Sequence, residues 1–210
     1  MKNLILLGGG GHCKSVIDVA ETAGYNIIGI LDPNLPIGET ILGYPVLGKD
    51  DLIDRYARDV AFVITVGQIK NPLIRKKLYE LVIKSGAHLA TIIAPTAHVS
   101  KYASIGEGTV VMHYAMVNAN TSIGKGCIIN TYANIEHDCQ IGHFCHISTG
   151  AMVNGECRIG DDTFIGSQSV ISNNVIVDSG CVIAVGTVIR KNVQIKGIYS
   201  GNPGMLKIKI

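Results

Sequence analysis

Large aromatic side chains are scarce in this sequence. Its 210 residues include no tryptophan and three phenylalanines, whereas glycine occurs 25 times. A hydrophobic core that lacks large rings has to be filled by small aliphatic side chains packed closely together. At this length the chain can still bury a substantial core, as one large domain or as two small ones.

Blocks of like charge and long apolar runs are also absent. The formal net charge is +2, so neither a nucleic-acid-binding face nor a membrane-surface face is indicated. The early apolar run, residues 4–7, ends at four glycines, residues 8–11. It is too short for the hydrophobic region of a signal peptide or for a membrane span. We therefore expect a cytoplasmic protein with no nucleic-acid or membrane partner.

The dominant feature of the sequence is a repeat of six residues that begins at Ile93. From there to Ile195 every sixth residue is isoleucine or valine, at 18 successive positions, and a small or β-branched residue stands two places before each repeat position from Val99 onward. Ile-Gly recurs at residues 105, 123, 141 and 159, at intervals of 18, which is three repeats. Chance does not produce this pattern, and a fixed short period indicates a solenoid.

The repeat predicts a triangular β-helix. Each unit forms one short strand and one corner, and three units close a coil. The aliphatic residue points inward at every face and stacks on its equivalent in the next coil, while the small residue fits the narrow interior. The pattern resembles the left-handed β-helix acyltransferases, and a left-handed winding is implied by that resemblance.

The repeat also accounts for most of the cysteines. No C-x-x-C motif occurs, and five of the six cysteines fall in the small inward position. We interpret these five as buried packing residues, with a metal-binding or redox role as the alternative. Cys13 lies outside the repeat. The five cysteines of the repeat are Cys127, Cys139, Cys145, Cys157 and Cys181.

The two parts of the sequence predict two domains. Residues 1–88 are expected to form a small Rossmann-like α/β domain, and residues 89–210 the β-helix domain with a C-terminal tail. Residues 3–32 indicate a strand, a glycine turn, a helix and a second strand that ends at Asp32; residues 61–67 indicate a third strand. A second helix is predicted with Asn71 as N-cap, Pro72 at its first position and Gly86 past its end.

The glycine turn of the first domain is a candidate anion site. It would present backbone N–H groups and a helix N-terminus to a group such as a diphosphate. The dinucleotide fingerprint is only partial, because Gly8 and Gly10 are followed by Cys13 where a third glycine would stand. A tight turn without a ligand is one alternative. A nicotinamide-dependent enzyme is another, although the domain is too short for two mononucleotide-binding halves.

The order and spacing of several motifs resemble one family over almost the whole chain, the PglD/NeuD-type sugar acetyltransferases. This family uses acetyl-CoA to acetylate nucleotide-linked amino sugars or, in the NeuD branch, sialic acids. The resemblance implies a homotrimer, acetyl-CoA as co-substrate and no metal. The motifs are GGGGH (8–12), ILD (30–32), VG (66–67), NTYANIEHDC (130–139), GHFCHISTGAMVNG (142–155) and SGNP (200–203).

The same resemblance assigns roles to individual residues. It implies that His137 is the catalytic base, that Asp138 raises its basicity and that Gly155 supplies the oxyanion donor. His146, Ser167 and Val185 are implied as acetyl-CoA contacts. Asn130 is implied as a polar contact to the acceptor. The implied nucleotide contacts in the first domain are Gly10, Gly11, His12, Asp32, Pro33 and Gly67.

The position of His137 in the repeat supports part of this assignment. It stands two residues after an inward isoleucine, so its side chain faces outward near a corner and cannot be a core histidine. A solvated surface histidine is the alternative. A zinc-dependent β-helix lyase with His113, His137 and His143 as ligands, and a non-catalytic nucleotide-sugar-binding protein, are the competing functions. Among acetyltransferases, we expect N-transfer to a nucleotide-linked 4-amino-4,6-dideoxy sugar, with O-transfer to a sialic acid as the alternative.

Overall fold

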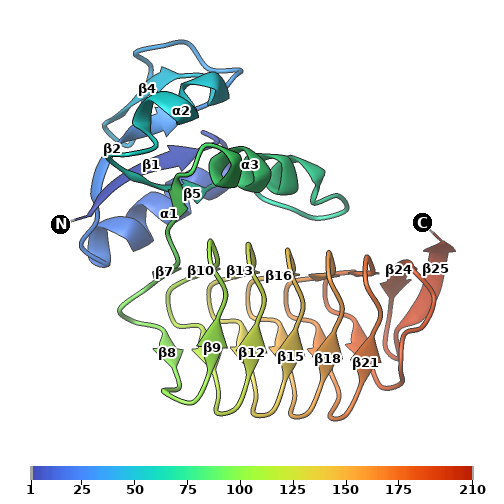
Figure 1. The fold of residues 1–210 in the computed structure, drawn as a ribbon. Helices are drawn as coiled ribbons and strands as arrows, with labels where there is room; N and C mark the ends of the chain where they lie inside the picture. The colour runs from blue at the N-terminus through green and yellow to red at the C-terminus, as the bar shows by residue number, and fades with distance from the viewer. Residues whose placement is uncertain (1, 210) are drawn as a thin grey trace.

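The computed structural model describes residues 2–209 and has two parts, an α/β domain that lies over one end of a long β-helix (Figure 1). The first part has a six-stranded sheet in the order β3-β4-β2-β1-β5-β6. Its strands are β1 (Asn3–Leu7), β2 (Asn26–Leu31), β3 (Thr40–Ile41), β4 (Tyr44–Gly48), β5 (Ala61–Ile64) and β6 (His88–Leu89). Its helices are α1 (Gly11–Thr22), the 3-10 turn η1 (Asp50–Leu52), α2 (Ile53–Tyr56) and α3 (Leu73–Lys84).

The central strands of this domain are parallel, as predicted for a Rossmann-like unit. β1 pairs with β2 on one side and with β5 on the other, so each connection crosses over the sheet through a helix or a loop. α1 buries Cys13, Val16 and Ile17 against the sheet, at the spacing of one helical face. α3 begins one residue later than predicted, because Pro72 is its N-cap, yet Asn71 Oδ1 still accepts a hydrogen bond of 2.9 Å from the Leu73 N–H.

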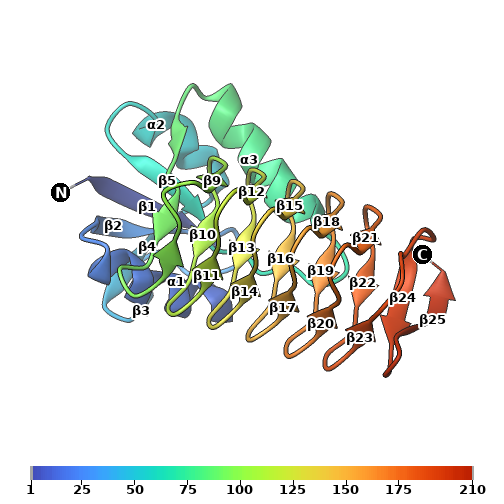
Figure 2. The ribbon, with the colours of Figure 1, turned by 90° about the horizontal axis from the view of Figure 1, so that it is seen from below.

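The β-helix has three flat faces built from two-residue strands (Figure 2). The first face holds β7 (Ile92–Ile93), β10 (Val110–Val111), β13 (Ile128–Ile129), β16 (His146–Ile147), β19 (Phe164–Ile165) and β22 (Val182–Ile183). The second face holds β8 (His98–Val99), β11 (Met116–Val117), β14 (Asn134–Ile135), β17 (Met152–Val153), β20 (Val170–Ile171) and β23 (Val188–Ile189). The third face holds β9 (Ser104–Ile105), β12 (Ser122–Ile123), β15 (Gln140–Ile141), β18 (Arg158–Ile159) and β21 (Ile176–Val177).

The register of the coils confirms the predicted period. Ile129 pairs with Ile147, Ile135 with Val153 and Ile141 with Ile159, each 18 residues apart. The aliphatic residues of the middle coils are buried in one continuous core that runs through the prism. The fold class predicted from the repeat, an α/β domain followed by a hexapeptide-repeat parallel β-helix, is therefore confirmed.

The prediction of inward-facing residues is wrong at the two ends of the repeat. Ile93 in the first coil is 37 % exposed and Ile195 in the last is 46 % exposed. Between Ile189 and Val193 the register shortens by two residues, because Val193 pairs with Val177 and Tyr199 with Ile183, each only 16 positions earlier. Tyr199 then takes the inward position and closes the core. The chain ends in β24 (Gly197–Ser200) and the antiparallel β25 (Met205–Lys209).

Several threonine, cysteine and serine residues at the small inward position are hydrogen-bond donors as well as space-fillers. Thr109 Oγ1 donates to the Gly124 carbonyl (2.8 Å), Cys127 Sγ to that of Gly142 (3.1 Å) and Ser169 Oγ to that of Ala184 (2.7 Å). Each bond reaches 15 residues ahead, to the corner of the next coil. The five cysteines of the repeat are all buried, as predicted, and Cys13 is buried too.

The α/β domain rests on the first face of the β-helix (Figure 1). The side of the sheet that carries α1 packs on Ile92, Val110 and Met112. On the other side of the sheet, Tyr79 of α3 meets Phe144 at a β-helix corner, with ring centroids 5.4 Å apart. The boundary between residues 88 and 89 stays a prediction. Within residues 2–209, no helix has both the length and the apolar composition required to cross a membrane.

Candidate active site

His137 stands at a corner of the β-helix, directly after β14, where the second face turns into the third. Half of its side chain is exposed, and its Nδ1 lies 2.7 Å from Asp138 Oδ2. Because a carboxylate can only accept, the neutral imidazole carries its proton on Nδ1 and leaves Nε2 as a base. The hydrogen bond to Asp138, followed by the negative charge of that residue, raises the pKa of His137 above its ordinary value.

Asp138 is itself held in place from the neighbouring coil. Its backbone is left-handed, with φ 61°, and its Oδ1 accepts a 2.6 Å hydrogen bond from Asn120 Nδ2. The bond from Asn120, and then the bond from His137, lower the pKa of the Asp138 carboxyl. Glu136, the other acidic neighbour, is occupied elsewhere, because it accepts hydrogen bonds from Asn118 and Asn134. The geometry therefore pairs His137 with Asp138, as the resemblance implied.

Gly155 lies one coil beyond His137 at the same corner, and the imidazole ring occupies the space of its missing side chain. A Cβ on residue 155 would lie 2.7 Å from Cε1 and 2.8 Å from Nε2 of His137. Any larger residue would displace the ring. Among residues 2–209 no group accepts a hydrogen bond from the Gly155 N–H, so this donor has no protein partner.

A second site lies in the α/β domain, at the carboxyl ends of β1, β2 and β5. One pocket there is lined by all six predicted nucleotide contacts, which come from the glycine loop, the end of β2 and the segment after β5. This is the edge at which open parallel sheets bind ligands. The six residues are Gly10, Gly11, His12, Asp32, Pro33 and Gly67.

The glycines of this pocket fall into two kinds. A Cβ on Gly9, which lies between lining glycines, would overlap the terminal methyl groups of Leu35 and Ile41, so both side chains would have to move. A Cβ on Gly10 or Gly11 would meet nothing within 4 Å. The fold does not require glycine at either position. Glycine there suits a group that approaches the backbone closely, such as a phosphate at the N-terminus of α1.

Asp32 has a structural task in addition to the predicted one. Its Oδ2 accepts a hydrogen bond from the Gly9 N–H (2.7 Å) and its Oδ1 accepts one from the Asn34 N–H (2.8 Å). Each carboxylate oxygen keeps a second lone pair for a ligand hydroxyl. The carboxylate therefore fixes the glycine loop and the turn after β2 relative to each other.

Two charged residues that sequence reasoning missed also line this pocket, Asp50 and Lys77. Burial, and then the charge of Asp32, raise the pKa of Asp50, while Lys77 opposes that shift. Lys77 lies on α3, four residues after Leu73. Neither Asp50 nor Lys77 belongs to a motif. Only the fold of the loops around η1 and α3 brings them to the glycine turn.

His12, in the first turn of α1, is a neutral residue of the pocket. Burial lowers its pKa to about 3, helped by the nearby charge of Arg75. Its Nε2 is buried and, among the described residues, has no hydrogen-bond partner. This atom is available to a ligand in the pocket.

His146 lies on the first face, and Asn130 lies beside this face, both beneath the α/β domain. His146 Nδ1 is 2.7 Å from the carbonyl of Gln68, and its Nε2 is 3.1 Å from Asn130 Nδ2. Burial lowers the pKa of His146 to about 4. Ser167, bonded to Ser148, and Val185, which is 72 % exposed, lie at successive coils of the corner between the first and second faces.

Within one chain, the predicted residues thus form two groups. His137, Asp138 and Gly155 share the corner between the second and third faces. The second group lies at and above the first face. It consists of Asn130, Ser167 and Val185, at the corner between the first and second faces, and of the residues of the α/β pocket above the first face. The three histidines of the zinc alternative stand at three different corners, and residues 2–209 contain no cluster of three or more metal-ligating side chains.

The hexapeptide prism, the glycine-loop domain and the histidine–carboxylate pair together define a two-domain β-helix protein of the acyltransferase class. Comparison with protein families matches residues 3–82 to the PglD N-terminal domain. Residues 120–155 and 156–191 match the bacterial transferase hexapeptide model of six repeats.

Individual relatives agree with these matches. The chain is 33 % identical to the acetyltransferase domain of PglB from Neisseria gonorrhoeae, with a TM-score of 0.92, and 99 % of this chain aligns with 100 % of that one. PerB from Caulobacter crescentus, solved with CoA and GDP-perosamine, is 27 % identical at a TM-score of 0.91 over 99 % of this chain and 98 % of that one. The chain therefore belongs to the PglD-type family of hexapeptide-repeat sugar acetyltransferases.

A curated relative from Bacillus subtilis, UDP-N-acetylbacillosamine N-acetyltransferase, is 34 % identical over 117 residues. That match covers 53 % of this chain and 52 % of the relative, so the chain matches about half the length of this protein. A second structure of the Neisseria domain contains acetyl coenzyme A.

Proposed function

We propose that this protein transfers the acetyl group of acetyl-CoA to the amine of a nucleotide-linked amino sugar, with His137 as general base. The observation that carries the proposal is the presence, in one chain, of a pocket suited to a diphosphate and of an exposed imidazole whose Nδ1 is held by Asp138 at 2.7 Å. The relatives named for bacillosamine and perosamine acetylation support the same reaction.

The chemistry of the acceptor explains the need for a base. An amine attacks the thioester carbon through its lone pair and must lose a proton as the bond forms. The neutral His137 takes that proton at Nε2, while Asp138 keeps the ring in the required tautomer. The Gly155 N–H donates to the negative oxygen of the tetrahedral intermediate, a contribution of about 3 kcal/mol for one such donor. Collapse of the intermediate releases CoA and leaves the amide.

No acyl-enzyme is required in this scheme. All six cysteines are buried, and burial raises the pKa of Cys13, the cysteine nearest the glycine loop, to about 11. A buried thiol of that kind is a poor nucleophile. Direct transfer within a ternary complex is sufficient, and no step needs a metal.

The two groups of predicted residues support a homotrimer as the active form. The His137 corner and the corner that carries Asn130, Ser167 and Val185 are separated by a full face of the prism. If prisms pack side by side, the His137 corner of one copy would lie next to the corner that carries Asn130, Ser167 and Val185 in its neighbour. Acetyl-CoA would then bind in the groove between the two copies. In this arrangement Ser167 and Val185 contact acetyl-CoA and Asn130 contacts the acceptor.

The pocket favours N-transfer to a nucleotide sugar over O-transfer to a sialic acid. A free sialic acid has neither a diphosphate nor a nucleoside and would leave the N-terminus of α1 and the open backbone at Gly10 and Gly11 without a partner. The preferred acceptor is therefore a 4-amino-4,6-dideoxy sugar linked to a nucleoside diphosphate.

A substrate panel tests the proposal. Purified protein is incubated with acetyl-CoA and either a UDP-, GDP- or dTDP-linked 4-amino-4,6-dideoxy sugar or sialic acid, and free CoA is followed. Rapid CoA release is expected with at least one nucleotide sugar and none with sialic acid. Release with sialic acid alone would favour the O-acetyltransferase, and nucleotide-sugar binding without release would favour a non-catalytic binding protein.

A further inference from the structure

Arg75 of α3 is a buried cation that no carboxylate neutralises. It is 1 % exposed, and none of the carboxylates within residues 2–209 forms an ion pair with it. Its Nη1 donates to the carbonyls of Val66 (2.6 Å) and Ile64 (3.3 Å), and its Nη2 donates to that of Gly126 (2.8 Å). Burial lowers its pKa to about 10, so it stays charged at neutral pH.

A charge in this position is costly to the fold. Removing a guanidinium from water without an opposite charge is unfavourable, and carbonyl partners compensate only in part. The Nε of Arg75 has no hydrogen-bond partner among the described residues. An apolar side chain of the same length would fill the space without this cost. The charge and the forked donors therefore indicate a role beyond packing.

Two of the three carbonyls that Arg75 holds, those of Ile64 and Val66, belong to the segment 64–68 that forms one wall of the nucleotide pocket. Thr65, Val66 and Gly67 line that pocket, and Arg75, which does not line it, binds the same segment from α3. The next alternate carbonyl, that of Gln68, is held by His146 Nδ1 at 2.7 Å. Three alternate carbonyls along one extended segment are thus fixed by side chains of α3 and β16.

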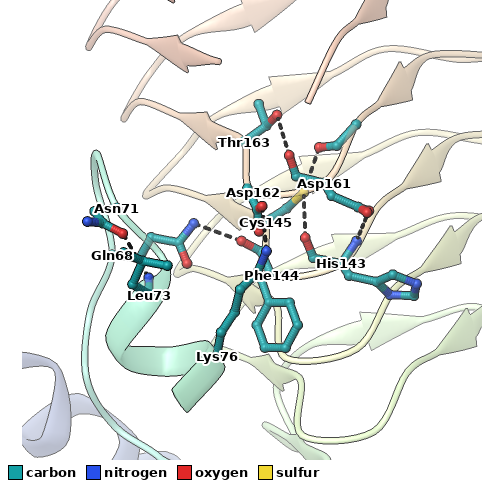
Figure 3. A network of polar contacts seen from close by, with 11 residues as sticks. Gln68, Asn71, Leu73, Lys76, His143, Phe144, Cys145, Asp161, Asp162 and Thr163 are labelled. Carbon is teal, nitrogen blue, oxygen red and sulfur yellow. Dashed lines mark hydrogen bonds and ion pairs between the residues drawn. The ribbon is translucent and has the colours of Figure 1, made fainter. Parts of the chain in front are cut away.

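The β-helix anchors the same segment. Gln68 Nε2 donates a 2.7 Å hydrogen bond to the carbonyl of Phe144, as Figure 3 shows, and Arg75 reaches the carbonyl of Gly126 one coil earlier. Lys76, next to Arg75, pairs with Asp162 one coil later. The wall of the pocket is therefore connected to three successive coils.

We propose that Arg75 is a positioning residue for the nucleotide pocket, which sets the wall 64–68 against the β-helix and places a positive charge behind it for the ligand's diphosphate. This inference rests on the proposed function only for the identity of the ligand. The charge acts across a low-dielectric interior, where a cation attracts an anion more strongly than in water. The lowered pKa of His12, to which the charge of Arg75 contributes, is consistent with a field that reaches the pocket.

Binding of UDP, GDP, UMP and GMP by calorimetry tests the inference without any turnover. Arg75→Met removes the charge and the forked donors but retains the length, and Lys84→Met is the matched control, because it removes an exposed cation from the last turn of the same helix. Arg75→Met should weaken the better-bound diphosphate at least tenfold and the corresponding monophosphate less. Lys84→Met and acetyl-CoA affinity should stay within twofold of wild type.

Two further variants keep the test decisive. Arg75→Lys retains the charge, is expected to fold, and should recover most of the preference for diphosphate over monophosphate. His146→Phe preserves the ring contact with Phe164 and cuts only the hydrogen bonds, and it should weaken nucleotide binding without removing that preference.

Other results would contradict the proposed role of Arg75. If folded Arg75→Met binds diphosphates within twofold of wild type, or loses diphosphate and monophosphate affinity equally, Arg75 has no electrostatic role in the pocket. If Arg75→Met does not fold, the other two variants decide: loss of the diphosphate preference in Arg75→Lys, or nucleotide binding like that of the wild type in His146→Phe, would contradict the inference. Absence of acetyl transfer by the wild type, with nucleotide binding intact, would instead contradict the proposed function alone.

Discussion

His137 differs from His143, another histidine at a corner, because a carboxylate holds one of its nitrogens. Asp138 takes the Nδ1 proton, and Asn120 fixes Asp138. His143, one hexapeptide later, instead accepts a 3.0 Å hydrogen bond at Nδ1 from the Lys125 N–H. Its remaining nitrogen therefore carries the proton when the ring is neutral and cannot serve as a base. Of these two corner histidines, only His137 presents a free lone pair.

The pH dependence of the reaction follows from this pair. In the proposed mechanism the working form of His137 is neutral, so kcat/KM should rise as the pH passes the pKa of this residue. Asp138 raises that pKa, which places the rise above the ordinary value of 6.5. Asp138→Asn should lower the rate and move the rise to lower pH. A rise that stays in place in Asp138→Asn would belong to the substrate amine and not to His137.

Loss of the imidazole itself should have the larger effect. His137→Ala should reduce kcat by about 10²-fold or more with little change in acetyl-CoA affinity.

Gly155 gives a second prediction at the residue scale. Gly155→Ala introduces a Cβ that would lie 2.7 Å from the His137 ring, and the backbone at residue 155 does not itself forbid alanine. The ring must move, so kcat should fall at least tenfold while the melting temperature stays near that of the wild type. Asn173→Ala, at the same corner one coil further, is the control and should retain full activity. Equal kcat in the two variants would remove Gly155 from the site.

These residues show what a sequence can and cannot predict about the site. His137, Asp138 and Gly155 are named through the resemblance of their motifs to the sugar acetyltransferases. The 18-residue step of the repeat explains why residues 137 and 155 lie at the same corner, because in a strict repeat each residue's neighbour in the next coil is known. Arg75, Lys77 and Asp50 carry no such signal. They reach the pocket through α3 and the loops before it, whose path depends on packing against the β-helix and not on any period.

At the scale of elements, α1 and its glycine turn provide the most direct test of the pocket. Gly11→Ala places a methyl group where the fold leaves open space, at the first residue of α1. Folding should be unaffected or strengthened by about 0.4–1 kcal/mol. Nucleotide-sugar affinity should fall severalfold with acetyl-CoA affinity unchanged, as calorimetry with each ligand would show. Ser15→Ala, exposed on the same helix, is the control; if both variants bind equally well, the glycine turn is only structural.

The strands of the middle coils were predictable from the repeat, but the two ends of the β-helix were not. Each middle coil has neighbours on both sides, so pairing and burial follow from the period alone. The first coil lacks a neighbour on one side, and Ile93 is exposed. At the other end the period is already two residues shorter at Val193. Tyr199 then closes the core, and its hydroxyl donates to the Ile195 carbonyl (2.8 Å), a contact that no six-residue pattern contains.

For the whole molecule, the separation of the two groups of site residues predicts complementation between inactive variants. His137→Ala lacks the base, and Gly11→Trp blocks the nucleotide pocket. When the two are unfolded together and refolded, activity should reappear, because the proposed homotrimer would combine an intact pocket from one copy with an intact His137 from another. Each variant refolded alone is the control. A mixture no more active than its components would mean that each chain builds its own complete site.

The central claim, that the protein forms an amide on a nucleotide sugar, is tested most directly by mass spectrometry of the product before and after mild alkali. The reaction contains acetyl-CoA and the nucleotide-linked 4-amino sugar that releases most CoA, with a parallel reaction on sialic acid. The account predicts one acetyl group on the nucleotide sugar, attached as an amide that survives alkali. An alkali-labile acetyl ester on sialic acid, with no acetylated nucleotide sugar, would contradict it.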